Sequence, residues 1–70
     1  MNLLISTKAA RIFGTERRIP VFSTDHASAT WCKLRDESGE GYSVIGNGGN
    51  LLDDNGKRIG TVSYNGRIWA

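Results

Sequence analysis

The stretch LLDDNGKRIGTVSYNGRIWA, residues 51–70, decides the fold because it holds two Asn-Gly pairs, each flanked by residues that favour strands. Asn-Gly is the strongest short signal for a β-hairpin, since a two-residue type I′ turn requires positive φ at both central residues. Turns centred on Asn55-Gly56 and Asn65-Gly66 therefore predict a meander of three antiparallel strands.

The first turn predicts a register that its charges support. With Asn55-Gly56 at the centre, one apolar pair and two pairs of opposite charge face each other: Leu52 with Ile59, Asp53 with Arg58, and Asp54 with Lys57. Each such pair contributes roughly 0.2–1 kcal/mol, and a shift by one residue loses the agreement. The second turn likewise places Tyr64 opposite Arg67 and Val62 opposite Trp69, with Gly60 expected at a bulge.

Upstream of the meander, residues 23–41 (STDHASATWCKLRDESGEG) predict a helix. Its N-terminus is capped by Ser23, Thr24 or Asp25, and the two glycines at its end supply the stop. Ala27, Trp31 and Leu34 recur at i, i+4 and i+7, which is one stripe of a 3.6-residue period. We expect Trp31 to anchor this helix on the core.

The N-terminal segment 3–14 (LLISTKAARIFG) admits two interpretations, because periodicity alone does not separate them. As a helix it begins at a Ser6 or Thr7 cap and ends at Gly14. We favour a strand, since residues 19–23 (IPVFS) are β-branched and aromatic and the proline suits an edge strand. Two such strands form a hairpin. Residues 42–45 (YSVI) indicate a short strand, followed by a loop.

These segments predict one domain over residues 1–70 with an α+β fold: a small five-strand, mainly antiparallel sheet with one helix packed on one face. The order is strand-strand-helix-strand-strand-strand. A chain of this length buries only about 60% of its unfolded surface, so its core is small. The expected core comprises Ile5, Ile12 or Phe13, Val21, Ala27, Trp31, Leu34, Val44, Leu52, Ile59 and Val62, with Trp69 as a further candidate.

The Gly-, Asn- and Asp-rich segment 46–60 (GNGGNLLDDNGKRIG) raises the question of a ligand-binding loop. Gly56-Lys57 is followed by Arg58 rather than Ser or Thr, so a P-loop is excluded, and no Gly-x-Gly-x-x-Gly fingerprint is present. A calcium loop needs alternating oxygen ligands and a distal Glu, and no Glu follows. The segment predicts structural turns, and we expect no cofactor and no metal.

The only histidine and the only cysteine, His26 and Cys32, lie in the predicted helix. A catalytic His or Cys requires a partner and an orienting group in a defined geometry, and no spacing here indicates one. We interpret His26 as a surface or capping residue and Cys32 as a small core residue beside Trp31. The sequence therefore predicts a protein that is not an enzyme.

Basic and aromatic residues gather at the expected turns and strands. The net charge of +2 and pI near 9.0 permit contact with nucleic acid without requiring it. Cations suit phosphates and rings suit bases, while arginine and aromatic residues also favour protein interfaces. The predicted partner-binding residues are Arg17, Arg18, Lys57, Arg58, Tyr64, Arg67 and Trp69.

The pattern IPVFSTDHASATWCKLRDESGEG (19–41), followed by hairpins that include DDNGKRIG (53–60), resembles small phage-encoded anti-CRISPR proteins, including some that act on type I-F surveillance complexes. The resemblance covers most of the chain as an order of elements. It implies a non-enzymatic inhibitor that occludes a surface of a host nucleoprotein complex. It assigns no functional residue.

We therefore expect a binding protein whose partner is a host protein or nucleoprotein complex, acting as a phage-type inhibitor. The alternative is a small sheet-based accessory protein that binds DNA or RNA. One cysteine cannot form an intramolecular disulfide, and MNLLIST (1–7) has no cleavage signature and is too short to span a membrane. These features indicate a cytoplasmic protein with no membrane partner.

Overall fold

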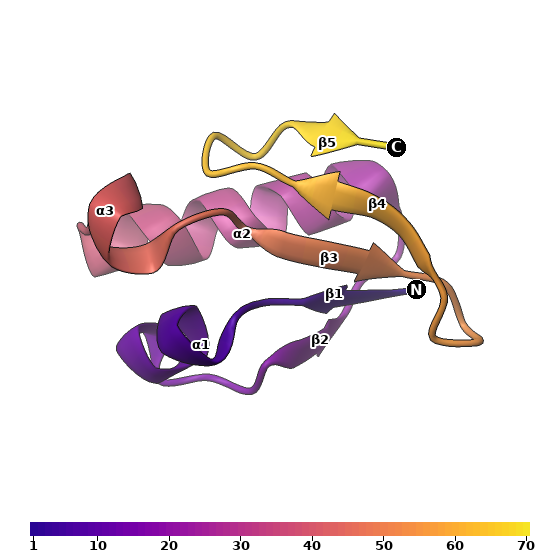
Figure 1. Ribbon diagram of the computed structural model, residues 1–70, viewed down its shortest axis with the longest axis horizontal. Helices are drawn as coiled ribbons and strands as arrows, with labels where there is room; N and C mark the ends of the chain where they lie inside the picture. The colour runs from indigo at the N-terminus through magenta and orange to yellow at the C-terminus, as the bar shows by residue number, and fades with distance from the viewer.

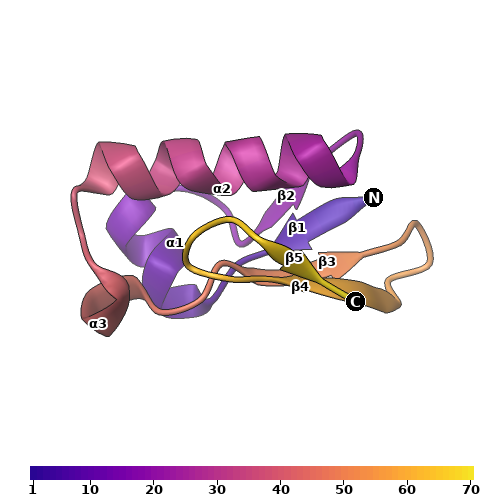
Figure 2. The same cartoon turned by 90° about the horizontal axis from the view of Figure 1, so that it is seen from above.

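The computed structural model describes residues 1–70 and has the predicted α+β fold with a five-strand antiparallel sheet, but it contains three helices where the sequence predicts one (Figure 1). The elements are β1 (Asn2–Leu4), α1 (Thr7–Phe13), β2 (Arg18–Pro20), α2 (Thr24–Ser38), α3 (Tyr42–Ile45), β3 (Gly49–Leu52), β4 (Arg58–Val62) and β5 (Ile68–Trp69). The strand order in the sheet is β2-β1-β3-β4-β5. Helix α2 lies along one face, and no helix covers the other (Figure 2).

Helix α2 begins and ends where its capping residues predict. The Ser23 hydroxyl accepts a hydrogen bond from the His26 N–H at 3.0 Å, and Gly39 ends the helix with φ of 70°. Two residues of α2, Ala27 and Trp31, are fully buried. The prediction that Leu34 belongs to the core is wrong: this residue is half-buried and lines a groove on the outer side of α2.

The first segment is the helix α1, so the strand that we favoured there is wrong beyond the three residues of β1. The Ser6 hydroxyl accepts from the Ala9 N–H at 3.0 Å, and Gly14 ends the helix in the left-handed conformation. The two caps and the helix-favouring Ala9 and Ala10 stabilise a helix here. Their effect is larger than the preference for a strand that comes from the irregular alternation of apolar residues. Ile12 is consequently 39% exposed and outside the core.

Residues 42–45 form the single helical turn α3 rather than the predicted short strand. Gly41 and Gly46 flank this turn, and Gly46 has φ of 71°. The turn buries Ile45 to 3% exposure and leaves Val44 only packed against the edge of the core. Burial of Ile45 thus decides the local structure of a segment too short to have a preference of its own.

Both Asn-Gly hairpins have three-residue loops instead of the predicted two-residue turns. In the first, the Gly56 N–H donates to the Asp53 carbonyl at 3.0 Å and the Asp53 N–H donates to the Lys57 carbonyl at 2.8 Å. The second repeats this pattern between Ser63 and Arg67. Only the glycines have positive φ, which is the geometry of a type I turn followed by a left-handed glycine.

The two predicted registers are therefore wrong by one residue. Val62 pairs with Ile68 rather than with Trp69, and Leu52 pairs with Arg58, with a register irregularity between Leu51 and Leu52. The expected ion pairs of Asp53 with Arg58 and of Asp54 with Lys57 are absent. Two residues expected in the core are exposed instead, Ile59 to 42% and Trp69 to 55%.

One hydrophobic cluster fills the space between the sheet and the helices. It comprises Leu3, Ile5, Ala9, Ala10, Val21, Ala27, Trp31, Ile45, Leu51 and Val62. The predictions for Ile5, Val21, Ala27, Trp31 and Val62 are confirmed. Phe13 packs edge-on against Trp31, with ring centroids 5.4 Å apart. Leu52 is also buried, but it lies outside this cluster.

The loop of the second hairpin is tied to α2 by hydrogen bonds to three successive carbonyls. The Trp31 indole N–H and the Arg35 guanidinium donate to the Tyr64 carbonyl at 2.8 and 2.9 Å. The Cys32 thiol donates to the Asn65 carbonyl at 3.6 Å, and the Ser28 hydroxyl donates to the Gly66 carbonyl at 2.7 Å. These contacts position β5, a strand of only two residues.

We predict that replacing Trp31 removes most of the stability of the protein. Trp31→Ala is expected to cost about 3–5 kcal/mol, because it removes a buried ring and a hydrogen bond to the hairpin. Trp31→Phe keeps an aromatic ring and leaves Arg35 on the Tyr64 carbonyl, so it is expected to cost less. Urea unfolding measures both. An Ala variant within about 1 kcal/mol of the wild type would contradict the assignment.

A matched pair of glycine variants tests the docking of the second hairpin. Gly56 and Gly66 have φ of 84° and 90°, so alanine strains both alike. A Cβ on Gly66 would lie 2.5 Å from the Cys32 sulfur, whereas a Cβ on Gly56 meets nothing within 4 Å. Gly66→Ala is therefore expected to destabilise by about 1–3 kcal/mol more than Gly56→Ala. Equal costs in thermal melts would show that the hairpin does not pack tightly on α2.

Candidate functional site

The face of the sheet opposite α2 carries a defined set of side chains. Paired residues of antiparallel strands point to the same side, and successive residues alternate. Leu3, Leu51 and Val62 point into the core, so the residues next to each of them along its strand point to the opposite side of the sheet. We call this outward side the open face. Its side chains are Asn2, Leu4, Arg18, Pro20, Asn50, Leu52, Arg58, Thr61 and Trp69, with Arg67 beside Trp69.

Three exposed arginines lie on the open face. Arg18 is on the edge strand β2 and pairs with Leu4, while Arg58 begins β4 and pairs with Leu52. The Arg58 guanidinium donates to the Thr61 hydroxyl at 2.8 Å, which holds its side chain along the strand. None of the three forms an ion pair with a carboxylate. Their cationic groups are therefore available to a partner.

The third arginine and the exposed tryptophan form one unit. The Arg67 guanidinium lies over the Trp69 indole, 4.9 Å from the ring centroid. Such a cation–π contact contributes about 0.5–1 kcal/mol at an exposed site and holds both side chains in place. Trp69 pairs with Thr61 and is 55% exposed, so the edge of the open face carries an ordered aromatic ring with a cation on it.

No acidic residue occupies an open-face position. Three of the seven carboxylates, Asp25, Asp36 and Glu37, are on α2, on the other side of the sheet. The Asp53 carboxylate accepts hydrogen bonds from the backbone N–H groups of Asn55 and Lys57 within its own turn, at 2.9 Å each. The three arginines of the open face therefore have no acidic side chain among the other positions of that face.

Asp54 at the tip of the first hairpin is neutralised by the N-terminus. Its carboxylate forms a hydrogen-bonded ion pair with the Met1 ammonium group. This hydrogen bond, together with the attraction of the positive charge, lowers the pKa of Asp54. Asp54 therefore does not compensate Lys57 or Arg58, contrary to the register expected from the sequence.

The structure brings together four of the seven predicted partner-binding residues: Arg18, Arg58, Arg67 and Trp69. The other three lie elsewhere. Arg17 donates through Nε to the Ile5 carbonyl at 2.8 Å, and Lys57 is at the hairpin tip. Tyr64 is half-buried at the end of α2, where its hydroxyl donates to the Glu40 carbonyl at 2.8 Å.

Several open-face residues were not predicted from the sequence: Asn2, Leu4, Pro20, Asn50, Leu52 and Thr61. Leu4 gives the face a half-buried apolar side chain, while Leu52 on the same side is buried. Asn50 and Thr61 add polar groups between the arginines and Trp69. The signal for this set is the two-residue alternation of strands. It becomes readable only when the register of every strand pair is known.

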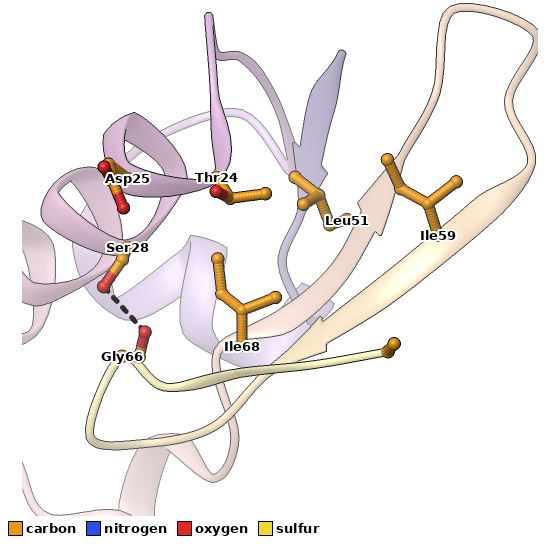
Figure 3. A pocket seen from close by; sticks show the side chains of 8 residues that line it. Thr24, Asp25, Ser28, Leu51, Ile59, Gly66 and Ile68 are labelled. Carbon is orange, nitrogen blue, oxygen red and sulfur yellow. Dashed lines mark hydrogen bonds between the residues drawn. The ribbon is translucent and has the colours of Figure 1, made fainter.

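A concave region lies between the start of α2 and the β4–β5 hairpin (Figure 3). This groove has a volume of about 430 Å³. Leu51, Ile59 and Ile68 form an apolar floor, and Thr24, Asp25 and Ser28 line the side formed by α2 (Figure 3). Asp25 is the only lining residue with a charged side chain.

His26 and Cys32 are each engaged in a structural contact. The Phe22 N–H donates to Nδ1 of His26 at 2.9 Å, and the two rings stack with centroids 4.9 Å apart. The His26 side chain, which we interpret from the sequence as a surface or capping group, thus bonds to the backbone just before the helix. Cys32 is half-buried against the second hairpin loop. No three His, Cys, Asp or Glu side chains cluster as a metal site would require.

The three helices are all too short or too polar to cross a membrane. Comparisons of the chain with protein-family models, with curated proteins and with solved structures found no match.

Proposed function

We propose that this protein is a non-enzymatic binding protein whose open face holds nucleic acid. The observation that carries the proposal is the presence of Arg18, Arg58 and Arg67 on one helix-free sheet face without a carboxylate. Phosphates of nucleic acid attract such cations, and their binding releases condensed counterions. A sheet face also presents rings and amides at fixed positions, which suits contacts with sugars and bases.

The inhibitor hypothesis uses the same surface. In it, the open face covers phosphates that are exposed on a host nucleoprotein complex, and occlusion follows from the bulk of α2 behind the sheet. Nucleic acid alone is the simpler ligand, because the three arginines suit phosphates and Trp69 suits a base, and neither contact requires a protein. We also propose a cytoplasmic location, which the single unpaired cysteine supports.

Paired charge variants test the proposal. Arg18→Gln/Arg58→Gln removes two cations from the open face, while Lys8→Gln/Arg11→Gln removes two exposed cations from α1 with the same change in net charge. Fluorescence anisotropy with a labelled oligonucleotide gives the affinity over a range of salt concentrations. The open-face variant is expected to reduce the salt slope by about 1.4–1.8, since each phosphate contact contributes about 0.7–0.9. The α1 variant is expected to retain most of the slope.

Two outcomes would count against the proposal. If the two variants lose affinity equally, the net charge and not the open face attracts nucleic acid. If the folded wild-type protein binds no oligonucleotide at low salt but captures a host complex that survives nuclease treatment, the partner is a protein surface. Surface substitutions of this kind usually change stability by under about 0.5 kcal/mol, so loss of folding does not confuse the comparison.

A further inference from the structure

The two tryptophans of the protein have opposite environments. Trp31 is fully buried, with its ring against Phe13 and its N–H bonded to the second hairpin loop. Trp69 is 55% exposed on the edge strand β5, and the Arg67 guanidinium lies over its ring. Phosphate binding does not use this large aromatic ring, which is held in place by a cation and yet left open to solvent.

An exposed indole distinguishes unpaired bases from paired ones. In a duplex, each base has both faces covered by its neighbours, so a side chain on a flat surface reaches only phosphates, sugars and groove edges. In a single strand, a base can leave its neighbours and stack on an aromatic ring, and every base has a face that can do so. Arginine beside the ring adds a cation–π contact and a phosphate ligand.

We propose that the open face binds single-stranded nucleic acid, with one unpaired base stacked on Trp69 and the flanking phosphates held by Arg67 and Arg58. This inference rests on the proposed function and specifies its ligand. DNA and RNA single strands share the required chemistry, because the stacking base and the phosphates are common to both.

The register supplies a path for the strand across the sheet. One row of paired residues runs from Trp69 through Thr61, Asn50 and Leu4 to Arg18, and it crosses all five strands. Neighbouring strands lie about 4.8 Å apart, so Trp69 and Arg18 are separated by about 19 Å. A short run of nucleotides fits this length, with the aromatic ring at one end and a cation at the other.

The middle of this row has suitable groups for the intervening nucleotides. The Asn50 side chain makes no hydrogen bond within the protein, so its carboxamide can donate to and accept from a base edge. Leu4 is half-exposed and offers an apolar surface to a sugar. The row contains no acidic residue that would repel the phosphates.

Intrinsic fluorescence tests the inference directly, because only one of the two tryptophans is accessible. A thymine single strand of about 12 nucleotides is titrated into the wild-type protein, followed by a uracil strand and a duplex of the same length. We expect both single strands to quench the fluorescence of Trp69 and to bind about tenfold or more tightly than the duplex. Stacking of this kind leaves the buried Trp31 unaffected.

Variants of Trp69 separate stacking from charge. Trp69→Leu is expected to abolish the quenching and to lower the affinity for the single strand about tenfold, measured by anisotropy with a labelled strand. Trp69→Phe keeps a ring and is expected to restore most of the affinity. Ile59→Ala, which alters an exposed apolar residue outside the row, serves as the control. Circular dichroism checks that each variant is folded. The titration of the wild-type protein tests the inference without the use of any variant.

The outcomes separate this inference from the function on which it rests. Equal affinity for duplex and single strand without quenching would overturn the single-strand inference and leave nucleic-acid binding intact. Full affinity of Trp69→Leu for the single strand would also overturn it. Absence of any binding by the folded wild-type protein at low salt would overturn both the inference and the proposed function.

Discussion

The buried indole of Trp31 is the contact on which the other parts of this structure depend. Its ring fills the space between α2 and the sheet, and its N–H donates to the Tyr64 carbonyl at 2.8 Å. A buried indole N–H without a partner costs free energy, so the hairpin and the helix are fixed relative to each other by the same residue that fills the core. Ser28 and Arg35, on the same side of α2, extend this contact along the hairpin loop. The loop in turn places β5 and, with it, Trp69.

Glycines allow the sheet to approach this indole closely. A Cβ on Gly48 would lie 3.0 Å from the Trp31 ring, and a Cβ on Gly49 would lie 2.2 Å from the Leu4 carbonyl. The glycines of the GNGGN loop are therefore needed for packing and for the start of β3. Because α2 and the core occupy one side of the sheet so closely, the long cationic side chains of the strands have only the other side available. The open face is in this sense a consequence of how the core is packed.

The sequence predicts the long and strongly capped element well and the short ones poorly. The boundaries of α2 follow from Ser23 and Gly39, whose side chain and backbone freedom act locally. The segment 42–45 has too few residues for any local preference, and the burial of Ile45 decides its form. Of the site, the residue types were predictable, since arginines and a tryptophan in the last strands suit a binding surface. Their common face was not, because it depends on pairing between strands that are far apart in sequence.

The register irregularity in the first hairpin decides which side chains of this strand pair lie on the open face. In a two-residue turn, Leu52 would face Ile59, and Arg58 would face Asp53 on the opposite side of the sheet. The three-residue loop and the irregularity at Leu51/Leu52 instead place Arg58 opposite Leu52, on the open face, and leave Ile59 at the rim of the groove beside α2. A one-residue shift reverses the side to which a strand residue points, so this small insertion exchanges an apolar side chain for a cation. Asp53 does not pair with Arg58. Its carboxylate instead accepts hydrogen bonds from two backbone N–H groups of the turn, and these stabilise the loop that produces the shift.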